Sequence, residues 1–291
     1  MEVKAECIPC LVDVRCREVM KVLNDSPEAC EICLEVIQKF SELIKETKHT
    51  TKIATELYRL VRKRLGVDPY RGEKREANRW ALEILPKALE MVNKSNDSFE
   101  RFNIAVRFSL IGNAIDLGVS GYTFNLNGLN NAFQNIKLDV DDVTTAYELA
   151  RRASTVLYVC DNAGEIVLDR LLVREFKRLG ARVVVAVRSE PYQNDATMEE
   201  AEESGIINDA DEVIAIGDCT YLAPEVLSKE ALDMFKNTEF AVLKGMANYE
   251  NLQNLRRIRE KGYFLLLRAK CNPIAKSLKI DRGGYVAKVI C

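Results

Sequence analysis

The amino-acid sequence predicts an α/β protein, a Rossmann-like three-layer sandwich with a mostly parallel sheet, preceded by an all-helical N-terminal domain. Residues 1 to about 100 show helical periodicity and no credible strand. From residue 149 onward, short runs of β-branched and aliphatic residues alternate with amphipathic stretches, as in βαβ units. The chain has 291 residues, near the length at which a single core stops growing. We therefore expect a helical domain over 1–148 and an α/β domain over 149–291.

Five helices are predicted before the sheet. Pro9 opens the first, and the pair Ser26-Pro27 is a typical capped start for the second. Gly66 to Tyr70 breaks the pattern, and Gly118 ends the fifth helix. The expected helices cover 9–23, 27–44, 51–65, 74–92 and 101–117. The segment from about 118 to 148 is expected to be an irregular connector, because its first part is rich in Gly and Asn.

The second half is expected to alternate strands and helices. Strands are predicted over 155–160, 181–188, 212–216, 240–244, 263–269 and 285–290. Helices are predicted over 164–179, 196–204, 224–236, 249–261 and 273–278. Right-handed crossovers would place helices on both faces of the sheet. Ligands of open α/β sheets bind beyond the carboxyl ends of the strands, so polar residues that follow strands are the candidates for function.

Composition limits the class of partner. The formal net charge is −2, and the 30% of charged residues are interspersed in sign, which argues against nucleic-acid or polybasic membrane binding. No apolar run approaches the roughly 20 residues of a membrane helix, and the first residues lack a secretory apolar region. We expect a cytoplasmic protein that binds a small soluble metabolite. The single histidine, His49, disfavours a Ser-His-Asp triad or a multi-histidine zinc site, and we interpret it as a solvated loop residue.

The segment Asp161-Asn162-Ala163-Gly164-Glu165 lies between a predicted buried strand and a helix. Carboxylate and amide oxygens are the ligands that Mg²⁺ or Mn²⁺ prefers, and a helix N-terminus favours a nearby phosphate. This pattern indicates metal-bound phosphate. The alternative is that Asn162 only caps the helix. The glycine spacing of dinucleotide-binding loops and of P-loops is missing, which disfavours NAD binding and ATP hydrolysis.

Asp195 follows the next predicted strand after a short loop. Adjacent parallel strands would place it beside Asp161, and two carboxylates in a dry crevice repel each other unless a cation lies between them. The alternative is that Asp195 is an ordinary N-cap of the helix that follows.

Lys244 and Lys270 each end an otherwise apolar strand. A buried ammonium is costly without an anion, so both are candidates for neutralising phosphate, or they extend to water. Asn248 and Glu250, shortly after Lys244, are expected to contact substrate or to cap a helix.

A polar pair, Asn113 and Asp116, interrupts the apolar fifth helix. The two residues are three positions apart and so share one helix face. Buried polar groups need partners, and we expect this pair to cover the crevice.

Two CxxC pairs, Cys7/Cys10 and Cys30/Cys33, lie in the helical half. Their spacing fits a structural zinc site with four thiolate ligands. A thiol-disulfide role and simple packing of small side chains are the alternatives.

In these segments the chain resembles the metal-dependent damage-control phosphatase family, also known as domain of unknown function 89, and its archaeal-type branch with an N-terminal CxxC. The resemblance implies a helical domain packed on an α/β domain, a divalent metal held by Asp161, Asn162 and Asp195, and hydrolysis of phosphate esters, often sugar phosphates or damaged metabolites. The Arg-Lys-x-x-Lys signature of the branch that acts on fructose phosphates is absent. The matching segments are Asp161-Asn162-Ala163-Gly164-Glu165, Asn194-Asp195, Lys244-Gly245-Met246-Ala247-Asn248-Tyr249-Glu250, Arg268-Ala269-Lys270, Gly112-Asn113-x-x-Asp116, Asp68-Pro69-Tyr70 and Cys7/Cys10.

The first hypothesis is a metal-dependent phosphatase that uses Mg, Mn, Co or Ni and acts on a small phosphorylated metabolite. Lys270 and Lys244 would hold the phosphoryl oxygens, and Glu165 or Glu250 would position water or sugar hydroxyls. A homo-oligomer is possible within this hypothesis.

Two other classes remain open. Members of the resembled family have been assigned S-adenosylmethionine-dependent carboxyl methyltransfer, although the turn at 161–165 lacks the usual glycine-rich cofactor loop. The third hypothesis is a non-catalytic metabolite- or metal-binding module in which the CxxC pairs matter most.

Overall fold

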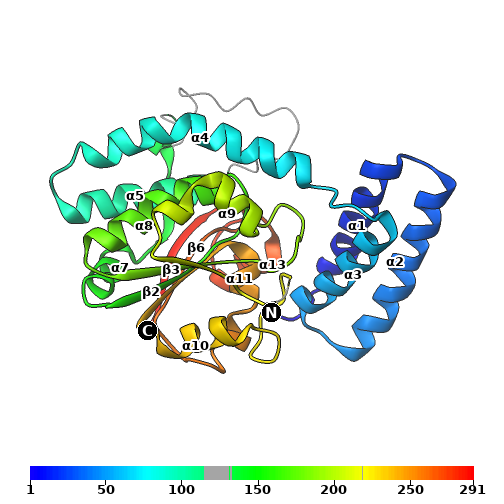
Figure 1. Cartoon of the computed structure of the whole chain (residues 1–291). Coiled ribbons are helices and arrows are strands. Elements are labelled where there is room, and N and C mark those ends of the chain that lie inside the picture. Colours follow the sequence, from blue (N-terminus) through cyan, green and yellow to red (C-terminus); the bar gives the residue numbers. More distant parts are fainter. Residues whose placement is uncertain (115–130, 132, 218) are drawn as a thin grey trace.

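The computed structural model describes residues 1–114, 131, 133–217 and 219–291 (Figure 1). Three helices at the N-terminus form a bundle beside a seven-stranded sheet that carries helices on both faces. The predicted α/β fold with an N-terminal helical region and a mostly parallel sheet is therefore confirmed. Asp116 and the fifth predicted helix beyond Ala114 lie outside the described residues.

The bundle consists of α1 (Cys7–Leu23), α2 (Pro27–Glu46) and α3 (Thr50–Leu65). Ser26 caps α2, as its side chain accepts a hydrogen bond from the Ala29 amide at 3.1 Å. Gly66 ends α3 with a φ of 69°, a left-handed conformation that glycine adopts without strain. The apolar faces of the three helices form a core of their own, made by Val19, Ala29, Ile32, Val36, Phe40, Leu43, Ile53, Leu57 and Val61.

The sheet has the strand order β1-β7-β6-β5-β2-β3-β4. Neighbouring strands run parallel except β6 and β7, which are antiparallel. The strands are β1 (Leu138–Asp141), β2 (Thr155–Val159), β3 (Arg182–Val187), β4 (Glu212–Ala215), β5 (Phe240–Lys244), β6 (Tyr263–Arg268) and β7 (Tyr285–Ile290).

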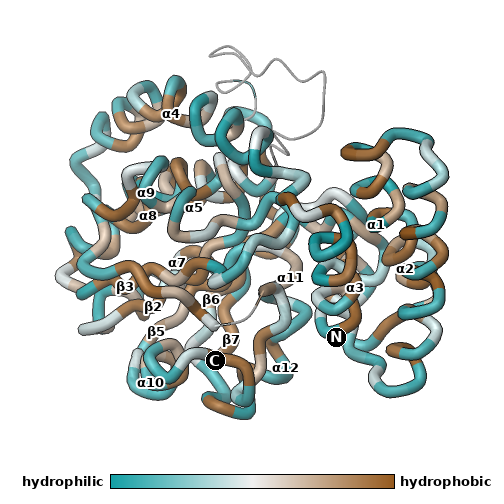
Figure 2. The backbone as a smooth tube through the Cα atoms, turned by 45° about the vertical axis from the view of Figure 1, so that its right-hand side comes forward, coloured by the Kyte–Doolittle hydropathy of each residue, from teal (hydrophilic) through white to brown (hydrophobic). Residues whose placement is uncertain are grey.

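Alternate residues of each strand enter different cores, as the period of two requires. Val156 and Tyr158 of β2 face one core, and Leu157 and Val159 face the other. The first core is covered by α4 (Arg71–Asn93), α5 (Ser98–Ala114), α7 (Val143–Ala150) and α8 (Glu165–Arg178). The second is covered by α10 (Lys229–Asn237) and α12 (Leu252–Leu255). Figure 2 shows these strands mainly in the brown of hydrophobic residues between the helical layers.

The helices before the sheet thus divide between two cores. α5 packs on the sheet, and α4 packs on α5, α8 and α9 in the same core. α1 to α3 pack on each other. Whether a domain boundary lies at residue 148 stays a prediction. The remaining helices, α9 (Met198–Ser204), α11 (Gly245–Glu250) and α13 (Asn272–Leu278), follow β3, β5 and β6 along the chain. No helix in the described part of the chain is both long and apolar enough to cross a membrane.

Three predicted elements are wrong in part. The expected irregular connector over 118–148 contains strand β1 and most of helix α7, and residues 131 and 133–135 are helical. The helix expected over 224–236 begins only at Lys229, because Ser228 caps it by accepting from the Ala231 amide at 3.1 Å. The single helix expected over 249–261 is two short helices, α11 and α12, which together end at Leu255.

His49 is not the solvated loop residue that we predicted. The ring is half-buried, with Nδ1 3.1 Å from Thr51 Oγ1 and Nε2 3.0 Å from Asn254 Nδ2. It packs edge-on against Tyr221, with the ring centroids 5.1 Å apart. Burial lowers the pKa of His49 to about 4, so the ring is a neutral packing residue at neutral pH.

Candidate active site

A cavity of about 540 Å³ lies beyond the carboxyl ends of the central strands. β2 lies between β3 and β5, and the chain leaves β2 toward β3 and later returns to its other side at β5. Such a reversal of strand order is where open α/β sheets bind ligands. The sheet side of the cavity includes Asn113, Asp161, Asn162, Asp195, Glu250 and Lys270, and the helical side includes Cys7, Cys10, Leu11, Arg15, Thr50 and Thr51.

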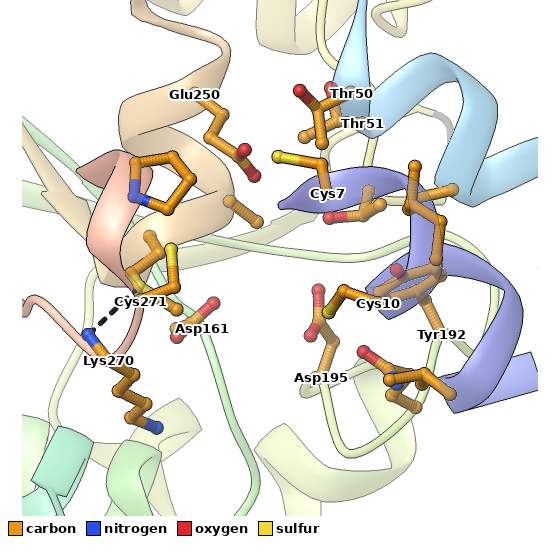
Figure 3. Close-up of a pocket in the computed structure, with 18 of the residues that line it drawn as sticks. Cys7, Cys10, Thr50, Thr51, Asp161, Tyr192, Asp195, Glu250, Lys270 and Cys271 are labelled. Atoms are coloured by element: carbon orange, nitrogen blue, oxygen red, sulfur yellow. Dashed lines mark hydrogen bonds between the residues drawn. The ribbon is translucent and has the colours of Figure 1, made fainter. Parts of the chain in front are cut away.

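Backbone hydrogen bonds join the two loops that carry the predicted acids. Asn162 and Asp195 form an antiparallel bridge, and the Ala196 amide donates to the Asp161 carbonyl at 2.8 Å. On the other side, the Ala163 amide donates to the Asn194 carbonyl at 2.8 Å. Figure 3 shows the carboxylates of Asp161 and Asp195 at the same cavity. The prediction that adjacent strands bring these two loops together agrees with this arrangement.

Asp161 is held by two amides. Its Oδ2 accepts from Asn113 Nδ2 at 3.0 Å and from Asn162 Nδ2 at 2.8 Å. Because the nitrogen of Asn162 is used in this way, its Oδ1 is the atom that could ligate a cation. Gly245 lies directly behind the carboxylate, since a Cβ built there would come within 1.8 Å of Asp161 Oδ2.

Glu165 connects this group to a buried lysine. Its Oε2 accepts from Asn113 and Asn162, at 2.9 and 3.1 Å. Its Oε1 accepts from Lys244 Nζ at 2.5 Å, and the same ammonium donates to Asp169 Oδ1 at 2.8 Å and to the Ser109 carbonyl at 3.0 Å. These three acceptors compensate for the desolvation of a fully buried ammonium.

The predicted contact of Lys244 with phosphoryl oxygens is therefore not made. Lys244 is 0% exposed and, like Glu165, lies behind the cavity wall and does not line it. Lys244 does have the anionic partners that its place at an apolar strand end predicts. These anions are carboxylates of the protein itself, Glu165 and Asp169. Lys270 does line the cavity and is half-buried.

Asp195 pairs with an arginine that the sequence analysis missed. Arg188 Nε donates to Asp195 Oδ2 at 2.8 Å, and its Nη2 donates to Asn248 Oδ1 at 2.9 Å. Asn248 is fully buried and also donates to the carbonyls of Cys160 and Lys244. The predicted substrate contact of Asn248 is thus replaced by a structural one. The signal for Arg188 was its charge at the end of an apolar strand, as for the lysines.

The buried carboxylates repel each other. Burial raises the pKa of Asp161 well above its usual value, and the charges of Glu165 and Asp195 raise it further. Burial also raises the pKa of Asp195, although Arg188 opposes the shift. The donors at the cavity are hard oxygens, two from carboxylates and one from an amide, and their excess negative charge fits a divalent cation. Asp161, Asn162 and Asp195 are the residues that could hold it.

Two further groups line the cavity. Arg282, which the sequence analysis missed, is exposed at the rim, and its Nε donates to the Lys270 carbonyl at 2.9 Å. Glu250, a predicted substrate-binding residue, faces the cavity from α11 (Figure 3). Burial raises the pKa of Glu250 to about 7.

The four cysteines of the CxxC pairs do not form the predicted zinc site. Cys7 and Cys10 line the cavity, whereas Cys33 on α2 is hydrogen-bonded to Cys16 of α1 and Cys30 is exposed. Across the described ranges, which contain all nine cysteines, no three His, Cys, Asp or Glu side chains converge as a metal-binding group. α1 and α2 form a helical hairpin, so the start of α2 lies against the later part of α1 and Cys33 meets Cys16 instead of Cys7 or Cys10.

Comparison with known proteins identifies the family. The family model of the damage-control phosphatase ARMT1-like domain matches residues 3–286 of this chain. The chain belongs to this family. A protein of Archaeoglobus fulgidus named a damage-control phosphatase is 32% identical over 100% of both chains. A Pyrococcus horikoshii protein with the same name is 27% identical, covering 98% of this chain and 97% of its own.

The fold of the family agrees with the structure described above. The crystal structure of a DUF89 family protein from Pyrococcus horikoshii superimposes with a TM-score of 0.88 at 25% identity, over 100% of both chains. The predicted membership of the damage-control phosphatase family is confirmed.

Proposed function

We propose that this damage-control phosphatase family member hydrolyses phosphate monoesters of small metabolites, such as sugar phosphates or damaged phosphometabolites, and that it depends on a divalent metal. The observation that carries the proposal is the pair of buried carboxylates, Asp161 and Asp195, on hydrogen-bonded loops at one cavity that also contains Lys270 and Arg282. The names of the relatives from Archaeoglobus and Pyrococcus support the phosphatase class.

In this proposal Asp161, Asn162 and Asp195 hold the cation. When bound, the cation would neutralise phosphate charge and lower the pKa of an attacking water. Lys270 and Arg282 present positive charge to the phosphoryl oxygens at the rim. Burial raises the pKa of Glu250 to about 7, so near neutral pH this carboxyl exchanges a proton readily and would serve as the acid for the leaving oxygen.

Asn113 and Lys244 would orient the carboxylates at the proposed metal site. Asn113 orients Asp161 and Glu165, and its Oδ1 accepts from the Arg268 amide at 3.0 Å, which fixes the amide orientation. Lys244 fixes Glu165 from behind. The clustered carboxylates favour metal-dependent hydrolysis over methyl transfer or a non-catalytic role.

The test replaces the Asp161 carboxylate by an amide of nearly the same size and shape. Asp161→Asn should lower Mn²⁺-dependent release of phosphate from p-nitrophenyl phosphate by at least about 100-fold, since even indirect changes around metal ligands cost 10- to 100-fold. Asp233→Asn, at an exposed position on α10, is the matched control and should leave turnover unchanged. Far-UV circular dichroism checks that both variants fold. Unchanged turnover in Asp161→Asn would refute the proposal.

A further inference from the structure

Gln193 has an unusual backbone conformation two residues before Asp195. Its φ is 46°, and it is one of three non-glycine residues with positive φ in the described part of the chain. The other two, Asn24 and Lys279, occupy C-cap positions of α1 and α13, where such values are common. Gln193 is the second residue of the turn in which the Asp195 amide donates to the Tyr192 carbonyl, a position where positive φ occurs but where glycine, asparagine or aspartate is usual. A left-handed backbone is unfavourable for a residue with a side chain and persists only where neighbours impose it.

The side chain of Gln193 is bound by helix α1. Its Nε2 donates to Glu18 Oε1 at 3.0 Å. The same oxygen accepts from Arg15 Nη2 at 2.8 Å and from the Tyr70 hydroxyl at 3.1 Å. Arg15 and Glu18 are only 3% and 1% exposed. An acceptor that is buried and bound by three donors is fixed in position, so Gln193 is attached to a rigid point of the helical bundle.

The residue before Gln193 is anchored to the same helices. The ring of Tyr192 lies 5.0 Å from the ring of Tyr58, and the Arg15 guanidinium lies 5.3 Å from the centre of Tyr192. The Tyr192 carbonyl then accepts from the Asp195 amide at 2.9 Å, which closes the turn that carries the acid. The Asp195 loop is therefore held on two sides, by the Asp161 loop of the α/β part and by the helical bundle.

We infer that Glu18 and Gln193, hereafter the α1 clamp, hold the Asp195 loop in a conformation it would not adopt alone and so position Asp195 for a divalent cation. Both are positioning residues, and the inference rests on the proposed function for the role of Asp195. The helical bundle then contributes to the metal site without supplying a ligand.

Two substitutions at one position test the clamp. Gln193→Ala removes the contact with Glu18 but keeps the penalty for positive φ, so the loop should relax. Gln193→Gly removes the same contact and the penalty together. We expect Gln193→Ala to weaken Mn²⁺ binding, measured by isothermal titration calorimetry without substrate, by about tenfold, a free-energy change of about 1.4 kcal/mol. Gln193→Gly should stay within about threefold of the unchanged protein. Gln38→Ala, at an exposed position of α2, is the control.

Amide hydrogen exchange in metal-free protein gives a second readout. The amides of Asp195 and Ala196, which donate to Tyr192 and Asp161, should exchange faster in Gln193→Ala and return toward the original rate in Gln193→Gly. A general loss of stability would speed exchange across the sheet and would not be restored by glycine.

The outcomes separate the clamp from the function. Unchanged exchange and unchanged affinity in Gln193→Ala overturn the clamp, and so does equal weakening of the alanine and glycine variants. If the unchanged protein binds no Mn²⁺, the proposed metal dependence fails, while the exchange pattern still decides whether the clamp exists.

Discussion

Lys244 and Lys270 end neighbouring segments of the sheet, yet their surroundings differ. Lys244 is enclosed by Glu165, Asp169 and the Ser109 carbonyl, and these carboxylates raise its pKa against the effect of burial. Lys270 lines the cavity. One lysine therefore stabilises the fold behind the site, and the other is placed to meet substrate.

This difference predicts opposite effects of the same substitution. Lys244→Met leaves two buried carboxylates without their cation and should lower the free energy of unfolding by about 3–5 kcal/mol. Lys270→Met should leave the melting temperature nearly unchanged and raise KM for p-nitrophenyl phosphate. Urea unfolding and steady-state kinetics on both variants measure these effects. A Lys244→Met protein as stable as the original would contradict the buried ion-pair network.

Glu250 predicts a pH dependence of stability. Burial raises the pKa of this carboxyl from 4.5 to about 7 in the folded protein, so the folded state binds the proton more tightly than the unfolded state. Its contribution to stability is complete below about pH 4.5 and is lost as the pH rises through about 7. Glu250→Gln carries no such charge and should melt at a higher temperature than the original protein at pH 8, but not at pH 4.

The control for this prediction is Glu260→Gln, at an exposed position. Thermal melts of the three proteins across this pH range give the comparison. Parallel pH profiles for Glu250→Gln and the original protein would show that the carboxyl does not carry the effect.

At the scale of elements, the alternation of apolar residues predicted six of the seven strands. β2, β3, β5 and β6 are buried on both faces, which gives them continuous apolar runs that are easy to recognise. β1 escaped prediction because Leu138–Asp141 is short, edge-located and half-exposed, with an acid at every second position. Its pairing with β7 depends on residues far away in sequence.

The start of α11 also depends on a tertiary contact. Gly245, with a φ of 77°, turns the chain from β5 directly into the helix and lies against Asp161. Periodicity alone places the helix later, because it contains no information about this close approach. The glycine is needed twice, for its backbone conformation and for the missing Cβ.

Gly245→Ala should therefore disturb the site and the fold together. The new Cβ would meet Asp161 Oδ2 at 1.8 Å and would occupy an unfavourable φ. We expect a loss of at least about 1–3 kcal/mol of stability and a large loss of Mn²⁺ affinity. Gly72→Ala is the control, because nothing lies within 4 Å of its Cβ position in α4. Calorimetry of metal binding and thermal melts test both variants, and an unaltered Gly245→Ala protein would contradict this geometry.

The candidate site could be predicted in part. The rule that ligands bind beyond the carboxyl ends of strands selected Asp161, Asp195 and Lys270, which do line the cavity. The same rule selected Lys244 and Asn248, whose side chains point inward, because strand position does not determine which way a side chain turns. The thiol spacing likewise gave no information about which turns of α1 and α2 meet, and Cys33 meets Cys16 instead of the first pair.

At the scale of the whole molecule, the cavity lies where the helical bundle meets the sheet. α1 and α3 supply Cys7, Cys10, Thr50 and Thr51, and the strand-end loops supply the acids. A bound cation would hold a loop that is joined to the largest core, since Asp161 lies two residues after the end of β2 and follows the core residue Cys160. Metal binding and global stability should therefore be coupled.

This coupling predicts a higher melting temperature in the presence of metal. A cation at about 100 times its dissociation constant stabilises the folded state by about 2.7 kcal/mol. For a chain of this size the melting temperature should rise by several degrees, roughly 2–4 °C per kcal/mol. Differential scanning calorimetry with and without Mn²⁺ measures the shift, and Asp161→Asn should abolish it. An equal shift in that variant would place the cation elsewhere.

The reversed direction of β7 decides where the chain leaves the sheet. Because β7 runs antiparallel to β6, it begins at the rim that holds Lys270 and Arg282 and ends at the other. Six residues of strand span about 20 Å. An affinity tag or a surface anchor fused after Cys291 would thus emerge far from the cavity mouth, and immobilised protein would keep that mouth open to solution.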